Sequence, residues 1–74
     1  MRSMDINRVF ADNIKLLRRQ RGLSQEALAE RAGLHRTYIG AVERGERNIT
    51  LLNANRIAEA LNVTLSECLE GAND

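Results

Sequence analysis

Apolar residues recur at spacings of three and four along most of the chain, which is the periodicity of amphipathic helices. The first such stretch covers about residues 6–21. There Phe10, Ile14 and Leu17 share one helical face, and Gly22 supplies the stop. We find no sustained apolar–polar alternation of the kind that marks a strand. The pattern therefore predicts an all-α fold.

Two short helices follow, separated by a glycine. Ser24 opens the first of them, because its hydroxyl can accept hydrogen bonds from free backbone N–H groups, and Gly33 ends it in a tight turn. The next helix runs from His35 or Arg36 to Arg44. We therefore expect a helix, a sharp turn and a second helix within about twenty residues.

Two further helices complete the predicted fold. Thr50 caps the fourth, at about residues 51–61, and Leu52 points away from the core. We expect the inner face of this helix to consist of Leu51, Ala54, Ile57, Ala58 and Leu61. Thr64 and Glu67 have the spacing of a capping box, which opens a short fifth helix.

Length and composition agree with this picture. The chain has 74 residues, enough for a single domain over residues 1–74 with a core at about 6–70. The single cysteine excludes an intramolecular disulfide framework and a multi-cysteine zinc site. No signal peptide or membrane-spanning apolar stretch is visible, so we expect no contact with a membrane and a cytoplasmic location.

Charge is distributed unevenly along the chain. Residues 1–47 hold ten arginines and lysines against six acids, whereas residues 48–74 hold one arginine against four acids. A basic front and an acidic rear suit a molecule that meets a polyanion on one side only, although an ordinary solvated surface is the alternative.

Little in the sequence favours an enzyme. The chain has one histidine, no glycine-rich phosphate loop and no ligands at metal-binding spacing. A helical bundle of this size leaves little room for a pocket. We therefore expect a protein that is not an enzyme and that has no cofactor, no metal and no small-molecule ligand.

Residues 25–44 have the pattern of a DNA-binding helix-turn-helix. A small residue, Ala29, stands where the two helices must approach, and Gly33 stands at the turn. The inner faces carry Leu28, Ala32, Leu34, Ile39 and Val42. Each match alone is weak, but together at these offsets they predict a second helix presented to the major groove of double-stranded DNA.

The stretch from about residue 10 to residue 69 resembles the phage repressor and Cro type of helix-turn-helix domain, a compact five-helix, lambda-repressor-like fold. The resemblance includes the segments Arg-Gly-Leu-Ser-Gln-Glu at 21–26 and Glu-Arg-Gly at 43–45. Residues 36–40 and 43–48 are most similar to the controller proteins of restriction–modification systems. That resemblance implies a small homodimeric regulator that binds palindromic operators upstream of its own gene and of the endonuclease gene.

The third helix carries the groups that we expect to meet DNA. Arg36 is our first choice for reading a base, because its guanidinium suits guanine O6 and N7, although a phosphate contact is the alternative. Thr37 can bond a base, meet a thymine methyl or contact a phosphate. Tyr38 can contact phosphate, stack on sugar and base, or pack against a neighbouring helix.

Other residues are expected to contact the DNA backbone. Gln25 starts the second helix, whose free N–H groups suit a phosphate, and by resemblance it also braces the recognition helix. Arg44, Arg47 and Asn48 follow that helix and are expected to reach flanking phosphates or an adjacent groove, with a solvated loop as the alternative for Arg47 and Asn48. Many controller proteins have aspartate at the position of His35, and aspartate would cap the recognition helix. Histidine caps a helix poorly, but it can donate a hydrogen bond to a phosphate.

The resemblance also implies a buried salt bridge and a dimer. Arg18 and Glu43 are expected to form an inward ion pair. The dimer interface is expected on the fourth and fifth helices, where more apolar surface is available than one core requires. We expect this interface to contain Leu52, Leu65, Leu69 and Cys68, although Cys68 is most simply a buried small hydrophobe.

Several alternatives remain open at this point. A DNA-binding antitoxin would need a toxin-facing surface, and a prophage-type repressor would use the same protein chemistry on another target. Activation rather than repression would require a surface for RNA polymerase, for which Glu26, Glu30 and Glu46 are equal choices.

Overall fold

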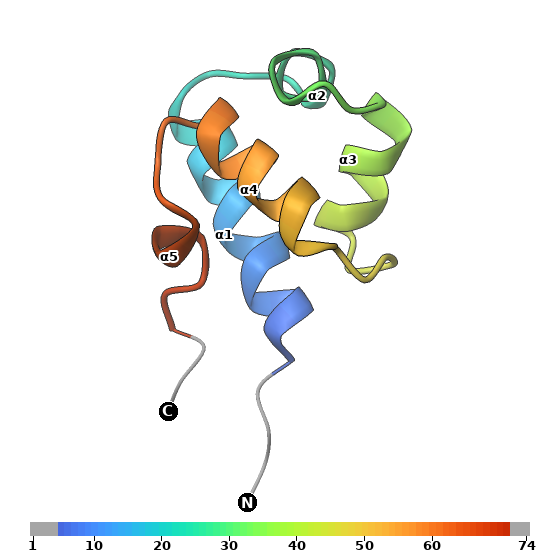
Figure 1. Ribbon diagram of the computed structural model, residues 1–74. Coiled ribbons are helices and arrows are strands. Elements are labelled where there is room, and N and C mark those ends of the chain that lie inside the picture. The colour runs from blue at the N-terminus through green and yellow to red at the C-terminus, as the bar shows by residue number, and fades with distance from the viewer. Residues whose placement is uncertain (1–4, 72–74) are drawn as a thin grey trace, which may run out of the picture.

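A computed structural model describes residues 5–71 of the chain, and every regular element in that range is a helix. The helices are α1 (Ile6–Gln20), α2 (Gln25–Ala32), α3 (Arg36–Glu43), α4 (Leu51–Ala60) and α5 (Leu65–Cys68) (Figure 1). The expected five-helix, all-α fold is confirmed. Helices α1, α3 and α4 end one residue earlier than expected, because Arg21, Arg44 and Leu61 serve as C-caps.

The polar residues expected to start helices do so. The Ser24 hydroxyl accepts a hydrogen bond from the Ala27 N–H at 2.9 Å, and the Thr50 hydroxyl accepts one from the Asn53 N–H at 3.1 Å. The capping box before α5 is complete. Gly33 ends α2 in the left-handed conformation, with φ of 72°, which permits the sharp turn into α3.

A single core lies between α1, α2, α3 and α4, and α5 closes one end of it. Helix α2 packs against both α3 and α4, while α1 packs against α3 and α5 (Figure 1). The largest fully buried side chains are Phe10, Ile14, Leu28, Ile39, Ile57, Leu61 and Cys68. The core therefore holds α3 from behind and leaves its outer face free.

The expectation for Leu51 was wrong, because its side chain is 79% exposed. Ala54, Ile57 and Ala58 of the same helical face are buried as expected. Leu51 occupies the first position of α4, where it borders a surface hollow beside α1 and α5 and is not covered by them. Periodicity gives the direction of a side chain but does not show whether another element covers it.

Candidate nucleic-acid interface

A buried ion pair joins α1 to the end of α3. The Arg18 Nε donates to Glu43 Oε2 at 2.6 Å, and Arg18 Nη2 donates to Glu43 Oε1 at 3.0 Å. The third guanidinium nitrogen, Nη1, donates to the Leu23 carbonyl at 2.8 Å. The inward salt bridge implied by the family resemblance is therefore present, and its two-pronged geometry fixes the orientation of α3.

The environment of Glu43 keeps its carboxylate ionised. Burial alone would raise the pKa of Glu43, but hydrogen bonds from Arg18 and from Gln25 outweigh this effect, and the pKa lies below its usual value. The hydrogen bond to Glu43 likewise raises the pKa of Arg18. Both groups are therefore charged at neutral pH, and each compensates the other.

Gln25 connects this ion pair to the protein surface. Its Nε2 donates to Glu43 Oε1 at 3.0 Å. Gln25 also lines a shallow hollow together with Arg36, Thr37, Gly40 and Arg44. The hollow therefore combines the start of α2 with the exposed side of α3, and several of its side chains can donate hydrogen bonds.

Gly40 is a buried residue at the base of this hollow. A Cβ at this position would lie 3.2 Å from Arg44 Nη1 and 3.4 Å from the side-chain oxygen of Gln25. Because glycine has no such atom, the side chains of Arg44 and Gln25 can pack close to the backbone of α3.

The start of α3 is uncapped by any side chain. His35 occupies the N-cap position but makes no capping hydrogen bond. The N–H groups of the first turn are therefore left without a side-chain acceptor, and the positive end of the helix dipole faces outward. Arg36 and Thr37, the next two residues, are both exposed.

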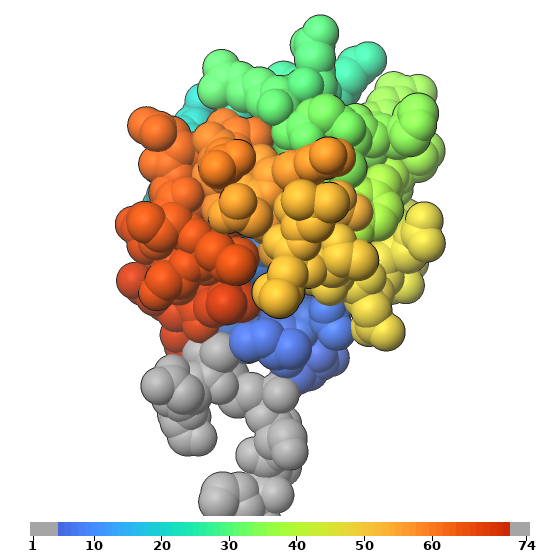
Figure 2. Space-filling view, in the orientation of Figure 1, coloured from blue at the N-terminus to red at the C-terminus, as the bar shows by residue number. Residues whose placement is uncertain are grey.

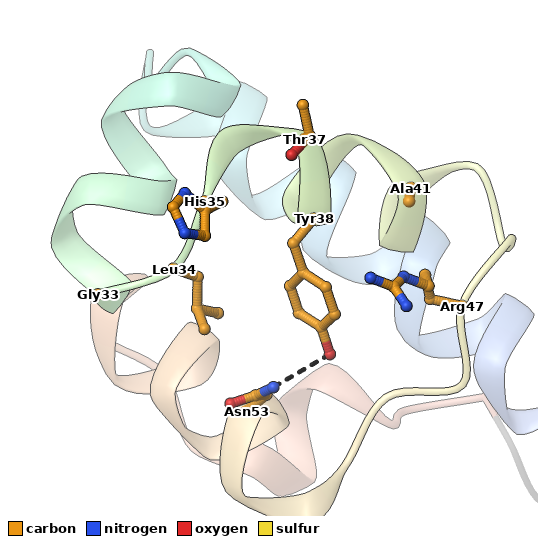
Figure 3. A pocket seen from close by; sticks show the side chains of 8 residues that line it. All are labelled: Gly33, Leu34, His35, Thr37, Tyr38, Ala41, Arg47 and Asn53. Carbon is orange, nitrogen blue, oxygen red and sulfur yellow. Dashed lines mark hydrogen bonds between the residues drawn. The ribbon is translucent and has the colours of Figure 1, made fainter.

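Tyr38 points from α3 toward α4. Its hydroxyl accepts a hydrogen bond from Asn53 Nδ2 at 3.2 Å, and the guanidinium carbon of Arg47 lies 5.3 Å from the ring centre (Figure 3). These residues line a second hollow together with Gly33, Leu34, His35, Thr37 and Ala41. In the free protein the ring therefore packs against a neighbouring helix and an arginine.

The side chains of Arg44 and Asn48, after α3, have different partners. Arg44 Nε forms an exposed ion pair with Glu46 Oε2 at 3.0 Å. The Asn48 side chain turns toward α1, where its Oδ1 accepts a hydrogen bond from Asn7 Nδ2 at 3.0 Å. The structure thus brings Gln25, Arg36, Thr37 and Arg44 together, and it brings His35, Tyr38 and Arg47 together beside them, whereas Asn48 bonds elsewhere.

An apolar hollow lies on a different part of the surface, where α5, the start of α4 and the first turn of α1 meet (Figure 2). It is lined by Ile6, Asn7, Phe10, Ile49, Thr50, Leu51, Ala54, Leu65 and Leu69. Leu52 is 63% exposed. Cys68, which was also expected in the dimer interface, is fully buried in the core, so its side chain offers no surface to a partner. Burial also raises the pKa of its thiol to about 11.

Comparison with known proteins decides the family. Residues 14–68 match the helix-turn-helix family model. The control protein C.SmaI of Serratia marcescens is 52% identical over 66 residues, which cover 89% of this chain and 79% of the relative. The crystal structure of the restriction–modification controller protein C.AhdI from Aeromonas hydrophila is 44% identical, with a TM-score of 0.81, covering 84% of this chain and 94% of that one.

The chain belongs to the helix-turn-helix family of restriction–modification controller proteins. A hypothetical transcription factor from Neisseria is also similar, at 46% identity and a TM-score of 0.85, with 88% of this chain and 75% of that chain covered. The protein is therefore a DNA-binding transcriptional regulator of the controller type.

Three further residues contact the candidate interface and were not expected from the sequence. Asn53 bonds Tyr38 from α4, and Arg8 and Asn7 of α1 bond the segment after α3. No local motif marks these partners, because each contact joins positions that are 15 or more residues apart. Leu51 was assigned to the core, although it lies beside the apolar hollow.

Within residues 5–71, the helices of this controller-type protein are too short or too polar for any of them to cross a bilayer.

Proposed function

We propose that this protein acts in the cytoplasm as a homodimer on a palindromic operator, with α3 of each protomer in the major groove, and controls genes of a restriction–modification system. The observation that carries the proposal is the convergence of exposed Arg36 and Thr37 with Gln25 and Arg44 on one hollow. At the edge of a DNA groove, Arg36 and Thr37 can reach bases, whereas Gln25 and Arg44 can reach phosphates.

The division of labour follows from side-chain chemistry. The planar guanidinium of Arg36 can donate two hydrogen bonds to guanine, which gives sequence discrimination. The hydrogen bond to Glu43 holds the Gln25 side chain in place, so that it is already oriented to contact the DNA backbone. Arg44 and Arg47 supply charge for flanking phosphates, which fixes register without reading sequence.

The dimer is supported by apolar surface that one protomer leaves uncovered. Leu51 and Leu52 are 79% and 63% exposed, and Leu51 borders the hollow lined by Leu65 and Leu69. In a two-fold interface each surface meets its own copy, so the Leu51 side chain of each protomer can enter the hollow of the other. Such a dimer places two recognition helices about 34–36 Å apart, one turn of DNA.

We expect an Arg36→Ala variant to lose sequence discrimination. Operator binding should weaken by about 1–3 kcal/mol at one base position, while binding to random duplex changes much less, because a base contact is lost. The measurement is a binding titration on the operator, on single-base variants of it and on random DNA. The operator is obtained by selecting bound fragments from random duplexes.

An Arg47→Ala variant provides the comparison. If Arg47 contacts phosphate alone, its loss should weaken all sequences alike and reduce the salt dependence of binding by about one phosphate. Arg56→Ala removes an exposed arginine from α4 and controls for net charge. Equal losses on operator and random DNA for Arg36→Ala would refute the base-reading role.

A His35→Asp variant is expected to be more stable but to bind DNA more weakly. Aspartate can accept hydrogen bonds from the uncapped N–H groups of α3, which should raise the free energy of unfolding by about 1 kcal/mol. The same carboxylate places negative charge beside the proposed backbone contacts. Chemical denaturation and operator titration measure the two effects.

His35→Ala separates the effect of losing the imidazole from the effect of gaining a carboxylate, because it removes the imidazole without adding a cap or a charge. Its stability should stay close to that of the wild type. A His35→Asp variant that gains stability without losing affinity would show that the N-terminus of α3 does not approach phosphates.

A further inference from the structure

The segment that leaves α3 is tied to α1 by the side chain of Arg8. Arg8 Nη2 donates a hydrogen bond to the Arg44 carbonyl at 2.9 Å. Arg8 Nη1 donates to Asp12 Oδ1 at 3.2 Å, one helical turn away on α1. The two bonds use both terminal nitrogens of the guanidinium, so Asp12 orients the group and the Arg44 carbonyl receives it.

The position of this carbonyl makes the contact favourable. Arg44 is the C-cap of α3, and the last carbonyls of a helix have no partner within the helix. A cation at that end also interacts favourably with the helix dipole. Arg8 therefore stabilises the exit of the recognition helix through both a hydrogen bond and its charge.

Gly45 makes room for this arrangement. Its φ is +74°, and a Cβ at this position would collide with Arg8 Nη2. The glycine therefore serves two purposes, because it permits the left-handed turn and leaves the Arg8 guanidinium access to the backbone.

A second tie from α1 holds the far end of the same segment. Asn7 Nδ2 donates to Asn48 Oδ1 at 3.0 Å, and the Ile49 N–H donates to Asn7 Oδ1 at 3.3 Å. The backbone turn after α3 reaches only to Glu46, whose N–H donates to the Ala41 carbonyl at 2.9 Å. Arg47 thus lies between two anchor points that α1 supplies.

We propose that Arg8 is a positioning residue for DNA binding, which holds the 44–49 segment in the conformation that meets the operator backbone. This inference rests on the proposed function, since it assumes that Arg44 and Arg47 contact phosphates. Without Arg8 the segment would sample more conformations in the free protein. The entropy lost on ordering it would then oppose DNA binding.

The experiment compares Arg8→Ala, Arg8→Lys and Arg19→Ala with the wild type. Arg19 lies on α1 and is exposed, so Arg19→Ala removes the same charge from the same helix. Arg8→Ala is expected to bind the operator about fivefold more weakly than Arg19→Ala, the order of loss when one or two further residues must be ordered on binding. Arg8→Lys should be nearly as weak, because an ammonium lacks the planar fork that joins Asp12 to the Arg44 carbonyl.

Two further readouts separate positioning from a direct DNA contact. If Arg8 acts by positioning, the slope of log affinity against log salt stays as in the wild type, whereas loss of a phosphate contact reduces it by about 0.9. Amide hydrogen exchange in the free protein should be faster at Gly45, Glu46 and Ile49, whose N–H groups donate hydrogen bonds, in Arg8→Ala but unchanged in Arg19→Ala.

The proposal is overturned if Arg8→Ala binds no more weakly than Arg19→Ala, if Arg8→Lys restores full affinity, or if the salt slope falls. Unchanged amide exchange in Arg8→Ala would also overturn it. Failure of the proposed function looks different, because the wild-type chain itself would then show no preference for any selected duplex.

Discussion

A Glu43→Ala variant is expected to lose about 3–5 kcal/mol of its free energy of unfolding. The substitution leaves the Arg18 guanidinium in place with only the Leu23 carbonyl as partner, and Arg18 is just 9% exposed. An uncompensated charge at such a site is costly because water cannot replace the lost carboxylate. For a chain of 74 residues this loss is a large part of the total stability.

Chemical denaturation followed by circular dichroism measures this loss. Glu59→Ala serves as the matched control, since Glu59 is an exposed glutamate on α4 whose removal should change stability by less than about 0.5 kcal/mol. An Arg18→Met, Glu43→Leu double variant should recover much of the loss, because it removes both charges. A single variant as stable as Glu59→Ala would contradict the structural role of the pair.

The Glu43 carboxylate also makes the stability of the protein depend on pH in the acidic range. The pKa of Glu43 is lower in the folded state than its ordinary value of 4.5. Its contribution to stability is therefore fully present above about pH 4.5 and is lost as the pH falls through the folded-state value. The Glu43→Ala variant should consequently lose less stability than the wild type on acidification in this range.

Leu51→Asp and Leu52→Asp variants are expected to be monomers. Each places a carboxylate on the apolar surface that we propose to be covered by the partner, where its desolvation opposes association. Operator affinity should fall on the order of a hundredfold or more, because the second half-site is no longer bound from the same molecule. Sedimentation velocity measures the association state, and titration on the full operator measures the affinity.

Leu16→Asp is the matched control for both variants. Leu16 is 56% exposed on α1, so it tests the effect of an aspartate on an exposed leucine outside the proposed interface. It should leave both the dimer and the operator affinity unchanged. If Leu51→Asp and Leu52→Asp both remain dimeric, the interface lies elsewhere on the surface.

Local chemistry made much of this fold predictable. Ser24, Thr50 and the Thr64–Glu67 pair cap helices as expected, because a cap is formed by residues three positions apart. Gly33 likewise marks a turn that needs a positive φ. The buried face of each helix followed from periodicity wherever another helix lay opposite it.

The features that the sequence did not reveal are contacts between residues far apart in the chain and a helical face that no other element covers. The bond from Arg8 to the Arg44 carbonyl joins positions 36 residues apart and involves a backbone group that any residue would have. The Asn53–Tyr38 bond similarly requires knowing how α3 and α4 are oriented. Leu51 was assigned to the wrong environment because a spacing of three or four cannot tell a covered face from an open one.

The short segment from Arg44 to Leu51 has a further consequence for the operators that this protein can use. The proposed DNA surface and the proposed partner surface lie at its two ends, and α1 braces it between them. In the proposed dimer, this braced segment therefore connects α3 to the two-fold axis without a flexible tether. One extra base pair between half-sites would rotate them by about a tenth of a turn, and a rigid dimer cannot follow. We therefore expect binding to depend on the spacing between half-sites as strictly as it depends on their base sequence.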